Sequence, residues 1–221
     1  MSKKIMLLAL AVASMAAFAL PSMAMAEDIP LHLVPKPEGA KSITGGAAEL
    51  STVGGTVVTS KKTDGTATFE TSTTGTIELT FTESSSFGFP CTSAGQSSGT
   101  VTTATQPFHL VTLPGKVPGI LITPPANGVF AEFTCAGFLT AVVKGNGIIG
   151  TITAPACGAS STTSTSKFEK SATGVQKHKK VEGTETEYHL TSSINGGAFQ
   201  EAAQVGEGIT NLVVNTKLEC T

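Results

Sequence analysis

The chain has 221 residues, a formal net charge of −2 and only 14% charged residues. All of its basic residues are lysines, so it lacks the side chain that makes bidentate contacts to phosphates and bases. This argues against nucleic-acid binding, whereas the abundance of Thr, Ser, Gly and Val is typical of an all-β, exported protein.

The first 26 residues have the features of a secretory signal peptide. Lys3 and Lys4 supply a positive head, an apolar core follows, and Ala24-Met25-Ala26 is a small-x-small cleavage site. We expect cleavage after Ala26 and secretion to the extracellular space, with no transmembrane segment in the mature chain. Several Pro and Gly in residues 27–46 predict a partly ordered N-terminal arm, and residues 47–221 are expected to form a single β domain.

Two hairpins are expected at the start of this domain. The first covers residues 49–60 and turns at two glycines, and the second covers residues 66–82, with a polar turn between the two hairpins. In the last strand Ile77, Leu79 and Phe81 alternate with polar residues, which predicts that these three side chains point inward.

The longest run of strand-forming residues is Phe130–Thr153, which glycines divide into three pieces. We predict an antiparallel three-strand meander, because Asn146-Gly147 is the sequence that two-residue type I′ hairpins favour. In its first strand Phe133 and Cys135 share one face and Phe130 belongs to the other.

Two structural features are expected in the C-terminal part of the chain. Residues 199–204 are expected to form a single helical turn, and in residues 209–220 an alternating pattern places Leu212, Val214, Leu218 and Cys220 on a buried face. In all, about a dozen strands and no long helix predict an antiparallel β-sandwich or barrel-like domain.

The four cysteines predict a disulfide-braced domain: Cys91, Cys135, Cys157 and Cys220. An even number in an exported chain indicates two disulfides, for which the spacing leaves three connectivities open. A zinc site is the alternative, but no two cysteines are close enough for a CxxC pair.

Five segments follow one another in a familiar order: FPCTSAGQSSGT (89–100), FAEFTCAG (130–137), VVKGNGIIGTITAP (142–155), GVQKHKKVEG (174–183) and INGGAFQEA (194–202). In this order they resemble a group of uncharacterised exported β proteins from soil actinobacteria. The resemblance covers most of residues 48–221, and the group has no assigned function.

The resemblance also implies a disulfide pairing. Members of the group tend to carry two further cysteines, where this chain has Ser60 and the pair Glu83-Ser84. The joint loss of both cysteines implies that Cys91–Cys135 is the shared bridge and that Cys157–Cys220 is a local addition.

Two short motifs are similar to those of enzyme sites. Gly145–Gly150 spells GxGxxG, but a dinucleotide site needs a helix after the turn, and strand residues follow here. Gly95–Gly99 spells GxSxG around Ser97, but strand residues follow again and nothing fixes His109 or another His as the base. We expect a hairpin and a loop, and keep a hydrolase using Ser97 as the least favoured alternative.

No catalytic, cofactor-binding or metal-binding residue is expected, and no cofactor. The chain has few Asp residues and its His are scattered. The four glutamates that could form a catalytic pair occupy outward-facing or ambiguous strand positions: Glu78, Glu132, Glu185 and Glu187. Residues Lys177–Lys180 are interpreted as a solvated turn, with contact to an acidic polymer or lipid headgroups as the alternative.

The expected function is that of a non-enzymatic structural or interaction protein of the cell envelope or extracellular space. Its partner there is unidentified, and self-association is possible. The alternative is a binding module for a small apolar ligand or a glycan. An enclosed apolar cavity would favour the binding module, whereas a filled core with an open edge strand would favour assembly.

Overall fold

The computed structural model describes residues 31–220, which form 17 strands and no helix. This confirms the predicted all-β, barrel-like fold class. Within these residues no helix is long and apolar enough to cross a membrane. The expected signal peptide, residues 1–26, lies outside the described part of the chain.

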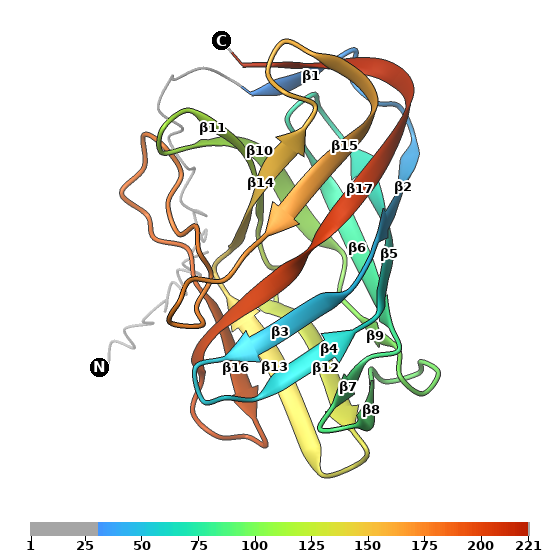
Figure 1. Cartoon of the computed structure of the whole chain (residues 1–221), viewed down its shortest axis with the longest axis vertical. Helices are drawn as coiled ribbons and strands as arrows, with labels where there is room; N and C mark the ends of the chain where they lie inside the picture. The colour runs from blue at the N-terminus through green and yellow to red at the C-terminus, as the bar shows by residue number, and fades with distance from the viewer. Residues whose placement is uncertain (1–30, 221) are drawn as a thin grey trace, which may run out of the picture.

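Eight antiparallel strands close into a barrel, called the upper barrel here after its place in Figure 1. In order around the barrel they are β2 (Ala40–Gly45), β5 (Lys62–Phe69), β6 (Thr74–Thr82), β10 (Gln106–Leu113), β11 (Val117–Ile122), β14 (Ile148–Ala154), β15 (Ser160–Phe168) and β17 (Gln200–Glu219). Strand β17 pairs with β2 and completes the ring, so the upper barrel has no edge strand.

The other sheet forms a second, less regular ring, called the lower ring. In pairing order its strands are β3 (Ala48–Thr52), β4 (Val57–Ser60), β7 (Ser85–Ser86), β8 (Phe89–Thr92), β12 (Val129–Cys135), β13 (Leu139–Gly145), β16 (Leu190–Ile194) and the first part of β17. Its weakest junction joins β4 to β7 at one residue pair, Thr59 with Ser85. The short strand β9 (Val101–Thr102) pairs with β6.

Strand β17 connects the two rings, because it is 20 residues long and runs through both (Figure 1). Its residues 202–205 pair with β3 in the lower ring, and its residues 208–210 pair with β2 in the upper barrel. Gly45 lies beside this crossing, where a Cβ atom would come within 2.3 Å of the Glu207 carbonyl oxygen. A glycine is therefore required for the two strands to approach each other.

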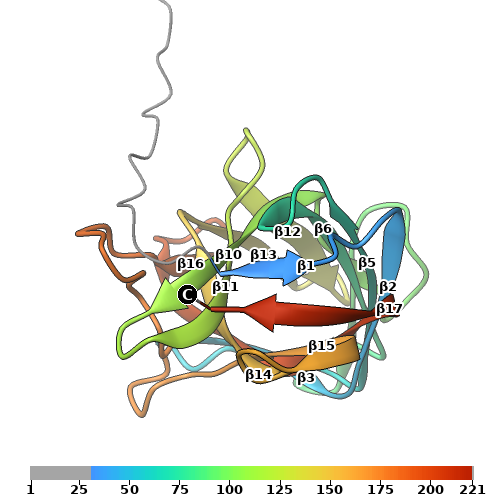
Figure 2. The same cartoon turned by 90° about the horizontal axis from the view of Figure 1, so that it is seen from above.

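The upper end of the barrel is covered by β1 (His32–Val34), which pairs with the last residues of β17. Figure 2 shows these two strands lying across the end of the barrel. Leu31, Leu33 and Leu218 are buried beneath them. Strand β2 is a barrel strand as well, so the part of the expected N-terminal arm that the structure describes is ordered, and the domain starts before residue 47.

The predicted three-strand meander is wrong. Strand β14 pairs with β11 and β15 instead of β13, so residues 145–147 form a corner between the two rings. Asn146 donates from Nδ2 to the Glu187 carbonyl and accepts the His189 amide at Oδ1, at 2.8 and 2.7 Å. A Cβ atom at Gly147 would lie 2.5 Å from the Tyr188 ring. The Asn-Gly pair therefore serves long-range packing against residues 187–189.

Two C-terminal expectations are also wrong. Residues 200–204 belong to β17, so no helical turn forms there. Leu212 and Leu218 are buried as expected, but Cys220 is only half-buried and Val214 is exposed. The alternation fails because β15 and β17 shift register between Ser161 and Thr163, and Val213 has a positive φ of 71°. The first hairpin (β3–β4) and the second (β5–β6) are confirmed, although β5 begins within the expected polar turn.

Both disulfides that the resemblance implied are present. Cys91 and Cys135 are bonded and face each other across β8 and β12, and Cys157 is bonded to Cys220 at the opposite end. No cysteine is free.

Ser60 and Ser84, at the positions for which the resemblance implies cysteines, are in contact. Their Oγ atoms lie 2.7 Å apart in a buried hydrogen bond.

Candidate functional site

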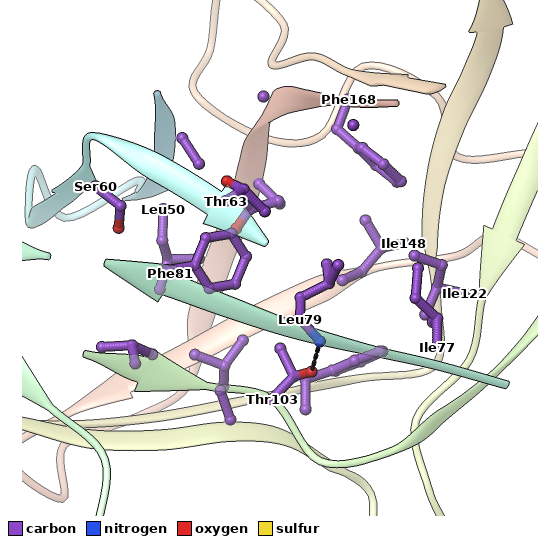
Figure 3. A pocket seen from close by; sticks show the side chains of 18 of the residues that line it. Leu50, Ser60, Thr63, Ile77, Leu79, Phe81, Thr103, Ile122, Ile148 and Phe168 are labelled. Carbon is purple, nitrogen blue, oxygen red and sulfur yellow. Dashed lines mark hydrogen bonds between the residues drawn. The ribbon is translucent and has the colours of Figure 1, made fainter. Parts of the chain in front are cut away.

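An apolar cavity lies inside the molecule, where the upper barrel meets the lower ring (Figure 3). Strand β6 contributes Ile77, Leu79 and Phe81 to its wall, which confirms that these three side chains point inward. The remaining large apolar lining residues come from both rings: Ile43, Leu50, Val58, Val101, Ile120, Ile122, Phe130, Phe133, Val143, Ile148, Phe168 and Leu190.

The cavity is large enough for a small ligand. The space that the centre of a water molecule can reach is about 120 Å³. One water needs about 10–15 Å³ by this measure, so the cavity corresponds to roughly eight to twelve waters, or roughly 240–360 Å³ of liquid. This is at the lower end of the size range of small-molecule sites.

Most of the polar side chains that line the cavity are already hydrogen-bonded to the protein. The Ser60 and Ser84 hydroxyls bind each other, and Thr103 Oγ1 accepts the Leu79 amide at 3.0 Å. Gln106 Nε2 donates to the Phe130 carbonyl at 3.2 Å. Water in the cavity would find few partners, and apolar cavities of this kind stay dry or take apolar molecules.

The only charged side chains among the cavity's lining residues are acidic, Glu49 and Glu207. Glu49 forms an ion pair with Lys170, and Glu207 is exposed. A carboxylate or phosphate ligand would therefore meet no cation on the cavity wall, while the two glutamates would repel it.

A smaller hollow continues the cavity toward the upper end. Its accessible space is about 30 Å³, and it shares Ile77, Ile120, Ser166 and Thr210 with the larger one. Phe69 and Phe108 close it with an edge-to-face contact at 5.1 Å between ring centroids.

The structure does not bring Ser97 and His109 together. Ser97 lies in an exposed loop whose neighbour Gly99 accepts the Ser84 amide, and a strand, not a helix, follows the loop. His109 lies opposite Thr74, at the other end of β6. The eight residue steps from Thr74 to Thr82, at about 3.3 Å each, put the two ends of β6 about 26 Å apart, so the two groups lie at opposite ends of this strand. Burial lowers the pKa of His109.

The other motifs fail for structural reasons as well. The GxGxxG segment runs into strand β14, so there is no helix N-terminus for a pyrophosphate. Glu78, Glu132 and Glu185 are exposed, and Glu187 pairs with Lys180 at 3.2 Å. Within residues 31–220 no three His, Cys, Asp or Glu side chains are grouped so that they could hold a metal ion.

The basic run 177–180 is neutralised by carboxylates. Lys177 lies 3.0 Å from Glu169, and Lys179 lies 2.8 Å from Glu201, which also contacts His189 Nδ1 at 2.7 Å. The Lys179 ammonium, followed by His189, lowers the pKa of Glu201. These lysines are structural ion-pair partners, in agreement with the interpretation of a solvated turn.

Which residues line the cavity depends on strand register, which the sequence does not reveal. Phe130 is predicted to lie on the face opposite Phe133, yet both side chains are buried and line the cavity. The pairing of β12 with β13 shifts between Val129 and Ala131, and this bulge turns Phe130 inward. The only signal in the sequence was the high density of apolar residues in this segment.

Comparisons of the chain with family models, with curated proteins and with solved structures found no match.

Proposed function

We propose that the protein is an exported, non-enzymatic carrier or receptor that binds a small, neutral, apolar molecule in the barrel cavity. The observation that carries this proposal is the cavity itself, which is apolar and of ligand size. Eight-stranded barrels have an interior that is either filled by side chains or holds one small ligand. The second arrangement fits the space found here.

The chemistry of the wall narrows the ligand class. Most of the hydroxyl and amide groups that line the cavity are hydrogen-bonded to the protein, so a glycan would lose its hydration with little replacement. The lack of a lysine on the wall disfavours fatty acids and phosphates. A hydrocarbon chain or ring system with at most one uncharged polar end matches the cavity best.

Binding of 1-decanol and of decanoate to the purified protein, measured by titration calorimetry, tests the proposal. We expect 1-decanol to bind and decanoate to bind at least about tenfold more weakly, because only the carboxylate must lose its charge hydration. Native mass spectrometry of the protein as purified from culture medium would show any ligand already bound.

A matched pair of variants locates the site. Ala131→Leu adds three carbon atoms to the cavity wall and should abolish 1-decanol binding. Ala94→Leu makes the same chemical change in an exposed loop and should leave binding unchanged. Failure of the unmodified protein to bind apolar molecules, or equal effects of the two variants, would reject the cavity as the site.

The expected role as an interaction protein of the envelope or extracellular space is the second proposal. It is favoured by an observation outside the cavity, the exposure of three phenylalanines at the lower end of the molecule.

A further inference from the structure

Three phenylalanines are exposed at the lower end and form what we call the aromatic tip: Phe87, Phe89 and Phe138. Their exposed fractions are 72%, 49% and 48%. The rings of Phe89 and Phe138 meet edge to face at 4.9 Å between centroids. Figure 1 shows the β7–β8 and β12–β13 hairpins, which carry them, at this end.

The aromatic tip is held rigidly. Phe89 precedes Cys91 by two residues and Phe138 follows Cys135 by three, and the two cysteines are bonded and fully buried. The side chains are therefore presented on hairpins cross-linked at their base. Little conformational entropy remains to be lost when the tip meets a surface.

Folding does not explain Phe87. It occupies the first position of a two-residue hairpin loop between Ser86 and Phe89, with φ of 51°, and Gly88 follows with φ of 81°. Two positive φ values are those of a type I′ turn, in which Asn is preferred and a bulky residue is strained. The chain thus places its most exposed phenylalanine where the backbone disfavours it.

The two hairpins that carry the tip contain no charged residue near it. Residues 84–93 and 133–143, which form both hairpin loops and their bases, contain no Asp, Glu, Lys or His. This end can therefore leave water without the large cost of dehydrating an ion. The same composition offers no charge that would select an anionic partner.

We propose that the aromatic tip inserts into the interfacial region of a lipid bilayer and holds the protein at an uncharged membrane surface. The partly exposed rings offer roughly 250–400 Å² of aromatic surface, if a phenylalanine buries about 150–250 Å² in full. A stable protein interface needs about 800 Å² from each partner, which makes a second copy of the chain a poor occupant. Reversible interfacial insertion scales with apolar area and needs no such minimum.

Flotation with phosphatidylcholine vesicles tests this inference, because these vesicles are electrically neutral. The protein should float with them, and binding should persist when the salt concentration is raised, since no charge pair contributes. Phe87→Asn and Phe138→Ser should each lower the vesicle-bound to free ratio by about tenfold or more.

Two controls separate insertion from loss of folding. Phe199→Ser removes a phenylalanine that is also 48% exposed but lies over Lys144 outside the tip, and it should leave flotation unchanged. Phe87→Asn should raise the melting temperature, because Asn suits the turn. A more stable variant with weaker vesicle binding would assign Phe87 to contact with lipid.

Three outcomes would overturn the inference: absence of flotation, equal losses for Phe138→Ser and Phe199→Ser, and concentration-dependent dimerisation that the tip substitutions abolish. Such dimerisation would show that the tip contacts a second copy of the chain instead of lipid. None of these outcomes bears on the cavity, because the inference does not depend on ligand binding.

Discussion

The two ends of the molecule are each fastened by a disulfide, but they present different chemistry to their surroundings. At the upper end, Glu219 is flanked by His32 at 3.2 Å and Lys217 at 3.0 Å. At the lower end the two hairpin segments 84–93 and 133–143 contain no charged residue and carry exposed phenylalanines. Only the upper end follows the usual rule that exposed surface is polar and charged.

This difference between the two ends distinguishes side chains that stabilise the fold from side chains that do not. Ion pairs around β1 and the end of β17 suit a strand pair that covers the barrel and stays in water. Phe87 and Phe138 contribute little burial, so their presence is better explained by an external surface. Because the exposed phenylalanines do not help the fold, we take their exposure to indicate contact with another surface. The upper end, which has no such residues in the described part of the chain, is the reference for this comparison.

Removing the disulfides one at a time is the strongest test of this comparison. The bridges span 44 and 63 residues, and each is worth about 4 kcal/mol in the chain-entropy model. The C91A/C135A variant should lose about 1 kcal/mol more than C157A/C220A, because Cys91 and Cys135 are fully buried and their truncation also leaves a cavity. Urea unfolding of both variants gives the two free energies of unfolding. A larger loss for C157A/C220A would mean that the strands covering the upper end control stability.

Replacing Ser60 and Ser84 by cysteines should raise the free energy of unfolding, by less than removal of a native disulfide lowers it. Because the two positions are separated by 24 in the sequence and their Oγ atoms lie 2.7 Å apart, S60C/S84C should form a third bridge that adds about 3 kcal/mol. Mass spectrometry without reductant shows whether the bridge forms, and urea unfolding gives the gain. Ser84→Ala is the control and should cost about 1–3 kcal/mol, because the buried Ser60 hydroxyl loses its partner. Two free thiols in the double variant would refute the prediction.

The sequence predicted the local hairpins well because their signals are local. The turn between β3 and β4 and the alternation of Ile77, Leu79 and Phe81 depend only on neighbouring residues, and both are confirmed. The Asn146-Gly147 corner could not be predicted in this way. Its geometry is set by bonds to Glu187 and His189, more than 40 residues away.

The cavity could not be predicted from the sequence for a related reason. Whether apolar residues fill a barrel or leave space depends on how the strands of two rings are staggered, and a single bulge at Phe130 changes the lining. The sequence shows the three phenylalanines of the aromatic tip, Phe87, Phe89 and Phe138, but it does not distinguish them from core phenylalanines. Only their exposure distinguishes them.

Acidification should produce the smallest effect and should act on one end alone. The Lys217 ammonium, with a contribution from His32, lowers the pKa of Glu219 below its ordinary value of 4.5. The ionised carboxylate is therefore favoured in the folded state. Its stabilising contribution is present above the ordinary pKa and is lost as the pH falls through the lowered folded value. Because this group is exposed, we expect local loosening without global unfolding.

Amide hydrogen exchange, corrected for the intrinsic effect of pH, measures this loosening residue by residue. Between neutral pH and about pH 2, amides of β1 and of the last residues of β17 should lose protection. Amides of β8 and of the β12–β13 turn should keep it, because residues 84–93 and 133–143 contain no group that titrates in this range. Glu219→Gln should remove the pH dependence at the upper end. If the lower end loosened to the same extent, the transition would be global, and carboxylates elsewhere, such as Glu201 with its lowered pKa, would be responsible.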